Sequence, residues 1–304
     1  MEPVKTFFFF LFVTVITACN PSVENKAKHV IFIGLDGWGS YSFEKAEMPN
    51  VKKLAEEGAY TLKKRSVLPS SSAVNWASMF MGAGPELHGY TEWGSKVPEL
   101  PSRVIGKNNI FPTVFQLLRD KNPSAETGCI YDWEGIKYIV DTLSLNYYEQ
   151  SPDYNTVPEG LCDMAVSYIT GKKPDFAAII FDEPDHIGHQ TGHDTPEYYA
   201  TLARLDGYIG KIIEAVKKAG IYDETVFIVT SDHGGVNKGH GGKTMLEMET
   251  PFIISGKNIK KGLLFDESMM QFDIAPTIGY IFDLEQPQVW TGRPMTQVFT
   301  TDNQ

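Results

Sequence analysis

The sequence predicts an α/β fold in which helices cover a mostly parallel central sheet. Short apolar runs alternate with segments of helical spacing from residue 29 onward, as in successive β-α-β units. The run of residues 175–181 (DFAAIIF) is apolar at almost every position, which is typical of a strand buried on both faces. Of the 304 residues, 42% are hydrophobic and 21% are charged, so the chain has enough apolar side chains for a large core.

Strands are expected where short apolar runs end at a turn residue. The first such run is residues 29–33 (HVIFI), which Gly34 follows. Four more apolar runs are equally short and are flanked by polar residues, so we expect each of them to form a strand. They lie at residues 127–131, 175–181, 225–230 and 251–255.

Helices are expected where apolar residues recur every three or four positions. The pattern of residues 48–58 ends at a glycine, and the longest pattern covers residues 195–219. Shorter helices are expected at residues 73–81, 112–120, 159–170 and 273–281. Two segments rich in Pro, Gly or Tyr, residues 85–109 and 146–158, are expected to form insertions or lids. No repeat divides the chain, so residues 29–304 are predicted to form one domain.

The first 28 residues indicate a leader and a tether. Lys5 precedes an apolar run of residues 7–18, which is too short to span about 30 Å of hydrocarbon at about 1.5 Å per residue. We therefore expect residues 1–18 to be a signal peptide, similar to that of a bacterial lipoprotein, with Cys19 as the lipidated residue. Residues 19–28 would tether the domain to the periplasmic or outer side of a membrane. Ordinary secretion after cleavage and a retained anchor are the alternatives.

Charge and cysteine content exclude some classes of protein. The formal charge is −11 and no Lys/Arg run occurs, so nucleic-acid binding is excluded as the main function. Three cysteines are too few for a disulfide-based scaffold. After Cys19, only Cys129 and Cys162 remain, and nothing in the sequence brings them within bonding reach.

Metal-ligand residues follow three of the predicted strands. They are Asp36 after the first, Asp182 to His189 after residues 175–181, and Asp232, His233 and His240 after residues 225–230. The carboxyl ends of parallel strands are where α/β proteins bind ligands. Mixed carboxylates and imidazoles suit Zn²⁺, Mn²⁺ or Fe²⁺ better than Ca²⁺. Each group also has a structural alternative: Asp36 as a turn or helix cap, Asp232 and His233 as a turn, and residues 239–242 as a flexible loop.

Together, these motifs resemble the alkaline phosphatase superfamily, and within it the type I phosphodiesterase and nucleotide pyrophosphatase branch. The matching segments are GLDG at residues 34–37, EPDHIGH at 183–189, SDHGG at 231–235 and KGHGG at 238–242. SAVNWASMFMG, which begins at Ser72, is similar to the branch's nucleophile segment, with Ser72 in place of Thr and Asn75 on the Asn three positions later. DIAPTIGYIF and GRPM near the end are similar to its last segment. The resemblance implies an alkaline phosphatase-like three-layer sandwich.

The resemblance also implies a site with two divalent metal ions, zinc first and manganese or iron as alternatives. One would be held by Asp185, His189 and His240, and the other by Asp36, Asp232, His233 and the hydroxyl of the nucleophile, Ser72. A simple helix cap is the alternative for Ser72. His29, His88 and His193 are expected to be structural or surface residues.

The chain departs from the branch's pattern at one substrate contact. An Asn after the His-Gly pair binds a phosphoryl oxygen in the branch, whereas Trp93 stands at that position here. Asn75, Thr91 or Lys243 are candidate replacements, and Trp93 is either a substrate-binding or a buried core residue. Trp93, Tyr147 and Tyr148 could provide an aromatic surface for a second ester substituent.

We therefore expect an exported hydrolase of phosphoric esters, with a small-molecule substrate and a phosphoserine intermediate. A phosphomonoesterase, a sulfatase-like hydrolase and a non-catalytic lipid-anchored binding protein are the alternatives. Sulfatases share the fold, but their nucleophile is followed by x-P-x-R, whereas Ser72 is followed by Ala, Val, Asn and Trp. No arginine lies within the metal-ligand segments, which favours diesters over monoesters, because monoesterases commonly bind the dianion with a guanidinium.

Overall fold

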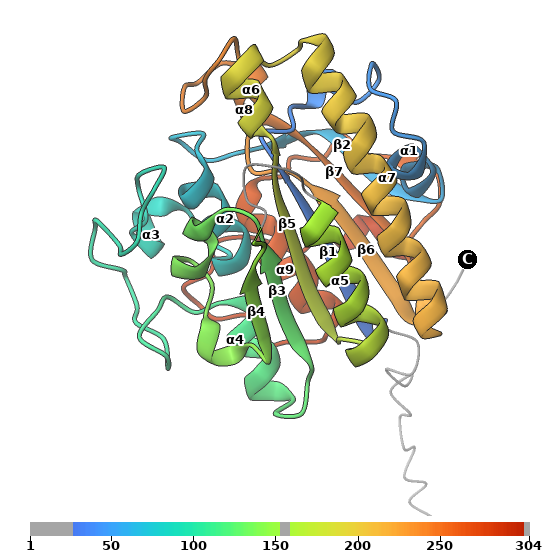
Figure 1. Cartoon of the computed structure of the whole chain (residues 1–304). Helices are drawn as coiled ribbons and strands as arrows, with labels where there is room; N and C mark the ends of the chain where they lie inside the picture. Colours follow the sequence, from blue (N-terminus) through green and yellow to red (C-terminus); the bar gives the residue numbers. More distant parts are fainter. Residues whose placement is uncertain (1–26, 153–158, 301–304) are drawn as a thin grey trace, which may run out of the picture.

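The computed structural model describes residues 27–152 and 159–300 (Figure 1). The predicted signal peptide, Cys19 and most of the tether lie outside these residues. Within the described part of the chain, every helix is too short or too polar to cross a membrane.

One eight-stranded sheet forms the centre of the molecule, in the order β4-β3-β5-β1-β6-β7-β2-β8. Strands β1, β3, β4, β5 and β6 are parallel, whereas β7 is antiparallel to both β6 and β2. The sheet is therefore mostly parallel, as predicted. The strands are β1 (His29–Asp36), β2 (Gly58–Arg65), β3 (Thr127–Tyr131), β4 (Tyr147–Gln150), β5 (Phe176–Pro184), β6 (Thr225–Thr230), β7 (Glu249–Gly256) and β8 (Leu263–Leu264).

Helices cover both faces of this sheet, because side chains in a buried strand alternate between faces. Val30 and Phe32 of β1 belong to the core on one face, and Ile31 and Ile33 to the core on the other. The first core packs against α2 (Ser72–Met81), α4 (Val114–Lys121) and α9 (Ile274–Ile281). The second packs against α1 (Pro49–Glu56), α5 (Glu159–Lys172) and α7 (Pro196–Ala219), and Figure 1 shows α5 and α7 in front of the sheet. This arrangement confirms the predicted three-layer sandwich.

Short helices complete the chain at the loops. They are α3 (Pro85–His88), α6 (Asp185–Thr191) and α8 (Met245–Met248), together with the 3-10 helices Ser40–Ser42, Glu134–Tyr138, Thr142–Ser144, Tyr222–Glu224, Gln271–Asp273 and Thr296–Val298. Figure 1 shows α6 and α8 beyond the end of β5.

The two remaining cysteines are both buried free thiols. Cys129 belongs to the core under α2 and Cys162 to the core under α5, so the sheet separates them.

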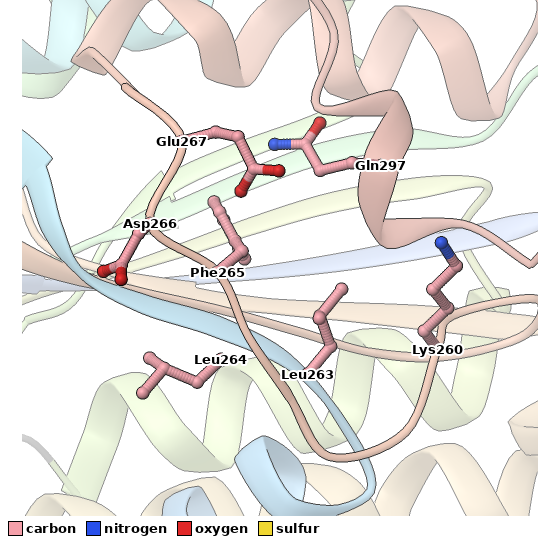
Figure 2. A pocket seen from close by; sticks show the side chains of 7 residues that line it. All are labelled: Lys260, Leu263, Leu264, Phe265, Asp266, Glu267 and Gln297. Carbon is pink, nitrogen blue, oxygen red and sulfur yellow. The ribbon is translucent and has the colours of Figure 1, made fainter.

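A surface groove of about 630 Å³ lies beside the edge strand β8 (Figure 2). It is lined by Lys260, Leu263, Leu264, Phe265, Asp266, Glu267 and Gln297. None of the predicted ligands belongs to it, because those residues follow strands in the middle of the sheet.

Candidate active site

The strand order brings the predicted metal ligands together. Strand β1 lies between β5 and β6, and all three are parallel, so their carboxyl ends meet at one edge of the sheet. Asp36 is the last residue of β1, Asp185 directly follows β5, and Asp232 lies two residues beyond β6. The location of the site thus follows from the topology.

The first ligand cluster contains Asp185, His189 and His240. Asp185 and His189 are four residues apart on α6, so both side chains lie on one side of the helix. The Asp185 Oδ2 atom is 3.1 Å from His189 Nε2 and 3.6 Å from His240 Nε2. Ligand atoms of all three residues lie within 4.8 Å of one another, which is close enough to hold one ion.

The second ligand cluster contains Asp36, Asp232 and His233, with Ser72 beside it. His233 Nε2 lies 3.3 Å from both Asp36 Oδ1 and Asp232 Oδ2. The Ser72 Oγ atom is 3.2 Å from His233 Nε2 and 3.4 Å from Asp36 Oδ1. Asp185 also reaches this cluster, since its carboxylate lies within 4.8 Å of the ligand atoms of Asp36 and His233.

Backbone carbonyls orient the three histidines. The Nδ1 atoms of His189, His233 and His240 lie 2.9, 2.9 and 3.0 Å from the carbonyl oxygens of Lys238, Gly234 and Ser70, respectively. A carbonyl oxygen only accepts, so each Nδ1 carries a proton and Nε2 is the ring nitrogen that faces the ligand cluster. This is the arrangement that metal-binding histidines need.

Burial of several acids in one place gives the site its electrostatic character. Burial, with the nearby negative charges of Asp232 and Asp185, holds the pKa of Asp36 well above its usual value. Burial likewise raises the pKa of Asp232 to about 7 and lowers that of His233 to about 3. Burial opposes ionisation of Asp185 too, but the histidine contacts outweigh it and keep that pKa low.

The donor set fits divalent cations. Asp232 Oδ2 is buried and has no hydrogen-bond partner, which is unfavourable for a carboxylate oxygen unless a cation contacts it. His233 is neutral over the ordinary pH range, as a ligand must be. Oxygen and imidazole donors together suit zinc, manganese or iron.

Helix α2 places Ser72 at the site, because this serine is its first residue. The Trp76 indole, one turn later, donates a hydrogen bond to Asp36 Oδ2 at 3.0 Å. Gly34 makes room for that ring, since a Cβ atom there would lie 2.4 Å from it. The nucleophile segment and the first ligand segment are therefore packed directly against each other.

Asn75 has a structural role in place of the predicted substrate contact. Its side chain is completely buried. It accepts a hydrogen bond from the Val67 amide at 2.7 Å and donates to the carbonyls of Ser71 and Pro69 at 2.9 and 3.1 Å. Both polar atoms are thus used to hold the loop that precedes Ser72.

Trp93 is a surface residue beside the nucleophile, so the core alternative is wrong. Its side chain is 69% exposed and stacks on Trp133, with the ring centroids 6.4 Å apart. Its carbonyl accepts a hydrogen bond from the amide of Ala73, the residue after Ser72. Tyr147, by contrast, stacks on Tyr168 of α5, in the opposite helix layer.

The other candidate donors have different positions. The Thr91 hydroxyl donates to Glu99, and Lys243 is exposed. His88 is buried against Ser78, as expected of a structural residue. His193 was expected to be structural or on the surface, but it is a buried neighbour of Asp185, at 3.2 Å. The repeated Gly-His spacing at residues 188–189 and 192–193 was the available sequence signal.

Comparisons with known proteins identify the family of this chain. The family model for type I phosphodiesterase / nucleotide pyrophosphatase matches residues 30–252. Venom phosphodiesterase 2 of Crotalus adamanteus is 25% identical over 237 residues, which cover 72% of this chain and 28% of the relative. The bis(5'-adenosyl)-triphosphatase enpp4 of Mus musculus is 22% identical over 227 residues, which cover 70% and 48%. The chain thus spans less than half of the length of these relatives.

Solved structures show the same fold. Murine ectonucleotide pyrophosphatase / phosphodiesterase 5, in an inactive form bound to AMP, superimposes with a TM-score of 0.74 at 15% identity, covering 90% of this chain and 100% of that one. A 2-O GAG sulfatase gives a TM-score of 0.70 at 14% identity, covering 89% and 74%. Because the family model matches most of the chain, this protein belongs to the type I phosphodiesterase / nucleotide pyrophosphatase family.

Proposed function

We propose that this protein is a metal-dependent hydrolase of phosphoric esters with Ser72 as its nucleophile. The observation that carries the proposal is the position of the Ser72 hydroxyl, which lies within 3.4 Å of Asp36 and His233. One ion would be held by Asp185, His189 and His240, and a second by Asp36, Asp232, His233 and Ser72. When bound, such ions would lower the pKa of the serine hydroxyl and neutralise the negative charge that develops on the phosphoryl group.

Ser72 would form and lose a covalent bond in each turnover. Its Oγ attacks phosphorus while the bond between phosphorus and the leaving oxygen breaks, and the departing alcohol takes up a proton. Water then attacks the phosphoserine and restores the hydroxyl. Ser72 is the first residue of the ten-residue helix α2, whose dipole favours negative charge at this end.

The substrate is proposed to be a diester. Four of the five arginines contact groups outside the ligand clusters: Arg65 pairs with Glu249, Arg119 with the Pro123 carbonyl, Arg204 with Thr201 and Arg293 with the Ser268 carbonyl. A dianionic monoester would therefore lack the guanidinium that commonly binds its extra charge. The stacked Trp93 and Trp133 rings provide an apolar surface for a second substituent.

The central experiment compares two serine variants. Ser72→Ala is expected to lower kcat by several orders of magnitude while the protein stays folded, because the nucleophile is lost. Ser71→Ala is the matched control, because the Ser71 hydroxyl is buried without a hydrogen-bond partner. Equal activity of Ser72→Ala and Ser71→Ala would contradict the proposal, as would full activity after the metals are stripped with a chelator.

Substrate class is tested with matched aryl esters. We expect kcat/KM to be higher for a p-nitrophenyl diester than for the monoester, and higher for both than for p-nitrophenyl sulfate. A preference of about tenfold or more for the monoester would show that another group meets its second charge. A preference for the sulfate would favour the sulfatase-like alternative.

Export and lipid attachment at Cys19 are also proposed. The leader at residues 1–18 and the small residue before Cys19 support this location. Mass spectrometry of the protein expressed in bacteria, compared with Cys19→Ser, tests it. An unmodified Cys19 at an intact N-terminus would contradict it.

A further inference from the structure

The segment that leads into α7 and the first turn of this helix contact the first ligand cluster and the loop that follows Asp36. His193 lies three residues before this helix, and its side chain is buried. Its Nε2 atom lies 3.2 Å from Asp185 Oδ1, on the carboxylate whose other oxygen, Oδ2, faces His189 and His240. Because this contact is made to the oxygen that does not face His189 and His240, it restricts rotation of the carboxylate.

The backbone fixes the His193 ring from the opposite side. Its amide donates to the Asn237 carbonyl at 2.6 Å, and its Nδ1 atom lies 3.1 Å from the same oxygen. Asn237 belongs to the loop that joins His233 to His240, so His193 connects that loop to Asp185.

Two glycines of the ligand motifs leave the space that the ring occupies. A Cβ atom on Gly188 would lie 2.5 Å from His193 Nε2, and one on Gly235 would lie 2.3 Å from the ring. Both distances are shorter than any side chain tolerates. Gly188 is on α6 and Gly235 follows His233, so the ring is enclosed by segments that carry ligands of both clusters.

Tyr198 extends this contact to the loop after Asp36. Its ring packs against His193, with the centroids 5.6 Å apart. Its hydroxyl donates to the Gly37 carbonyl at 2.8 Å and accepts from the Gly39 amide at 3.3 Å. Tyr198 is buried in the first turn of α7.

We propose that His193 and Tyr198 are positioning residues that hold the two ligand clusters in place relative to each other. His193 orients Asp185, and Tyr198 fixes the loop that follows Asp36. The inference rests on the proposed metal ions, and it assigns a function to two residues that would not contact the ions themselves.

The test measures zinc affinity by competition with a chromophoric chelator. His193→Phe keeps a ring but removes both nitrogen contacts, so we expect affinity to fall about tenfold or more, as for other residues that orient metal ligands. His193→Gln, whose amide N–H can still donate to Asp185, is expected to recover part of the loss. Tyr198→Phe removes only a hydroxyl and is expected to weaken binding as well. His186→Phe is the matched control, because His186 lies on the same helix as Asp185 but pairs with Gln190.

The outcomes separate this inference from the proposed function. A folded His193→Phe or Tyr198→Phe protein with affinity within about threefold of wild type would overturn the inference while the metal-dependent function stands. If His193→Phe does not fold, the zinc affinities of Tyr198→Phe and His193→Gln test the inference in its place. Wild-type protein that binds no zinc, manganese or iron would contradict both.

Discussion

Replacing Asn75 with alanine is expected to destabilise the protein strongly, because a completely buried amide loses all its partners. The Val67 amide would be left without an acceptor, which costs about 1–3 kcal/mol. The hydrogen bonds donated to the Ser71 and Pro69 carbonyls contribute about 0.5–1.5 kcal/mol each. We therefore expect the free energy of unfolding to fall by about 4 kcal/mol.

Urea unfolding of the chelated and the metal-loaded protein measures this loss. With a slope of about 3 kcal/mol per molar urea, the midpoint should fall by roughly 1 M. Asn122→Ala is the control: the Asn122 side chain is half-buried and accepts hydrogen bonds from the exposed Ser124, so its loss should stay below about 1 kcal/mol. Unchanged stability together with a raised KM in Asn75→Ala would refute this reasoning and support the substrate contact that the sequence predicted.

Two further predictions concern pH and metal removal. Burial lowers the pKa of His88 to about 3, so the folded protein keeps this side chain neutral while the unfolded chain protonates it below its ordinary pKa of about 6.5. The unfolded chain then binds more protons than the folded protein, so the free energy of unfolding falls as pH decreases. Between pH 7 and pH 5, His88 should account for a decrease of about 2 kcal/mol. Urea titrations should show no such decrease in His88→Gln. Burial and neighbouring acids raise the pKa of Asp232 to about 7, so in metal-free protein ionisation of this carboxyl destabilises the fold as pH rises from about 4 to 7. Asp232→Asn should therefore be more stable than wild type in chelator at pH 8 and less stable than wild type in zinc; the same ranking in both conditions would contradict the assignment of Asp232 as a ligand.

The fold and the positions of the candidate ligands could be predicted because both depend on local sequence. A run such as HVIFI indicates a buried strand by itself, and Asp36 follows only three residues beyond it in the chain. Strand β2 was missed because its sequence, GAYTLKKR, contains two consecutive lysines. Lys64 is nevertheless completely buried, since its Nζ donates to the Ser231 carbonyl at 2.8 Å and to Gln271. Both partners are more than 160 positions away, so no local pattern indicates them.

The sequence did not indicate the contacts that several individual side chains make. Asn75 was predicted from its register to bind substrate, but the partners that use its amide come from the turn before α2. Tryptophan is a large apolar residue that is commonly buried, but Trp93 lies on the surface. Its backbone carbonyl, rather than its ring, contacts α2. The repeated Gly-His spacing draws attention to His193, but it does not indicate that the ring lies between Gly188 and Gly235.

The charges of the site indicate why metal and substrate binding should be coupled. Asp36, Asp185 and Asp232 are buried at the place where a phosphoryl group would lie, and the whole chain carries a formal charge of −11. Without cations, an anionic ester would meet the ionised Asp185 carboxylate, and above about pH 7 that of Asp232, in a region of low dielectric where repulsion is weakly screened. Lys64 is buried nearby, but its Nζ donates to the Ser231 carbonyl, and burial holds the pKa of this side chain well below its usual value. We therefore infer that the cations bind the phosphoryl group, and that the exposed Trp93 ring and the half-buried Trp133 ring contact an uncharged substituent.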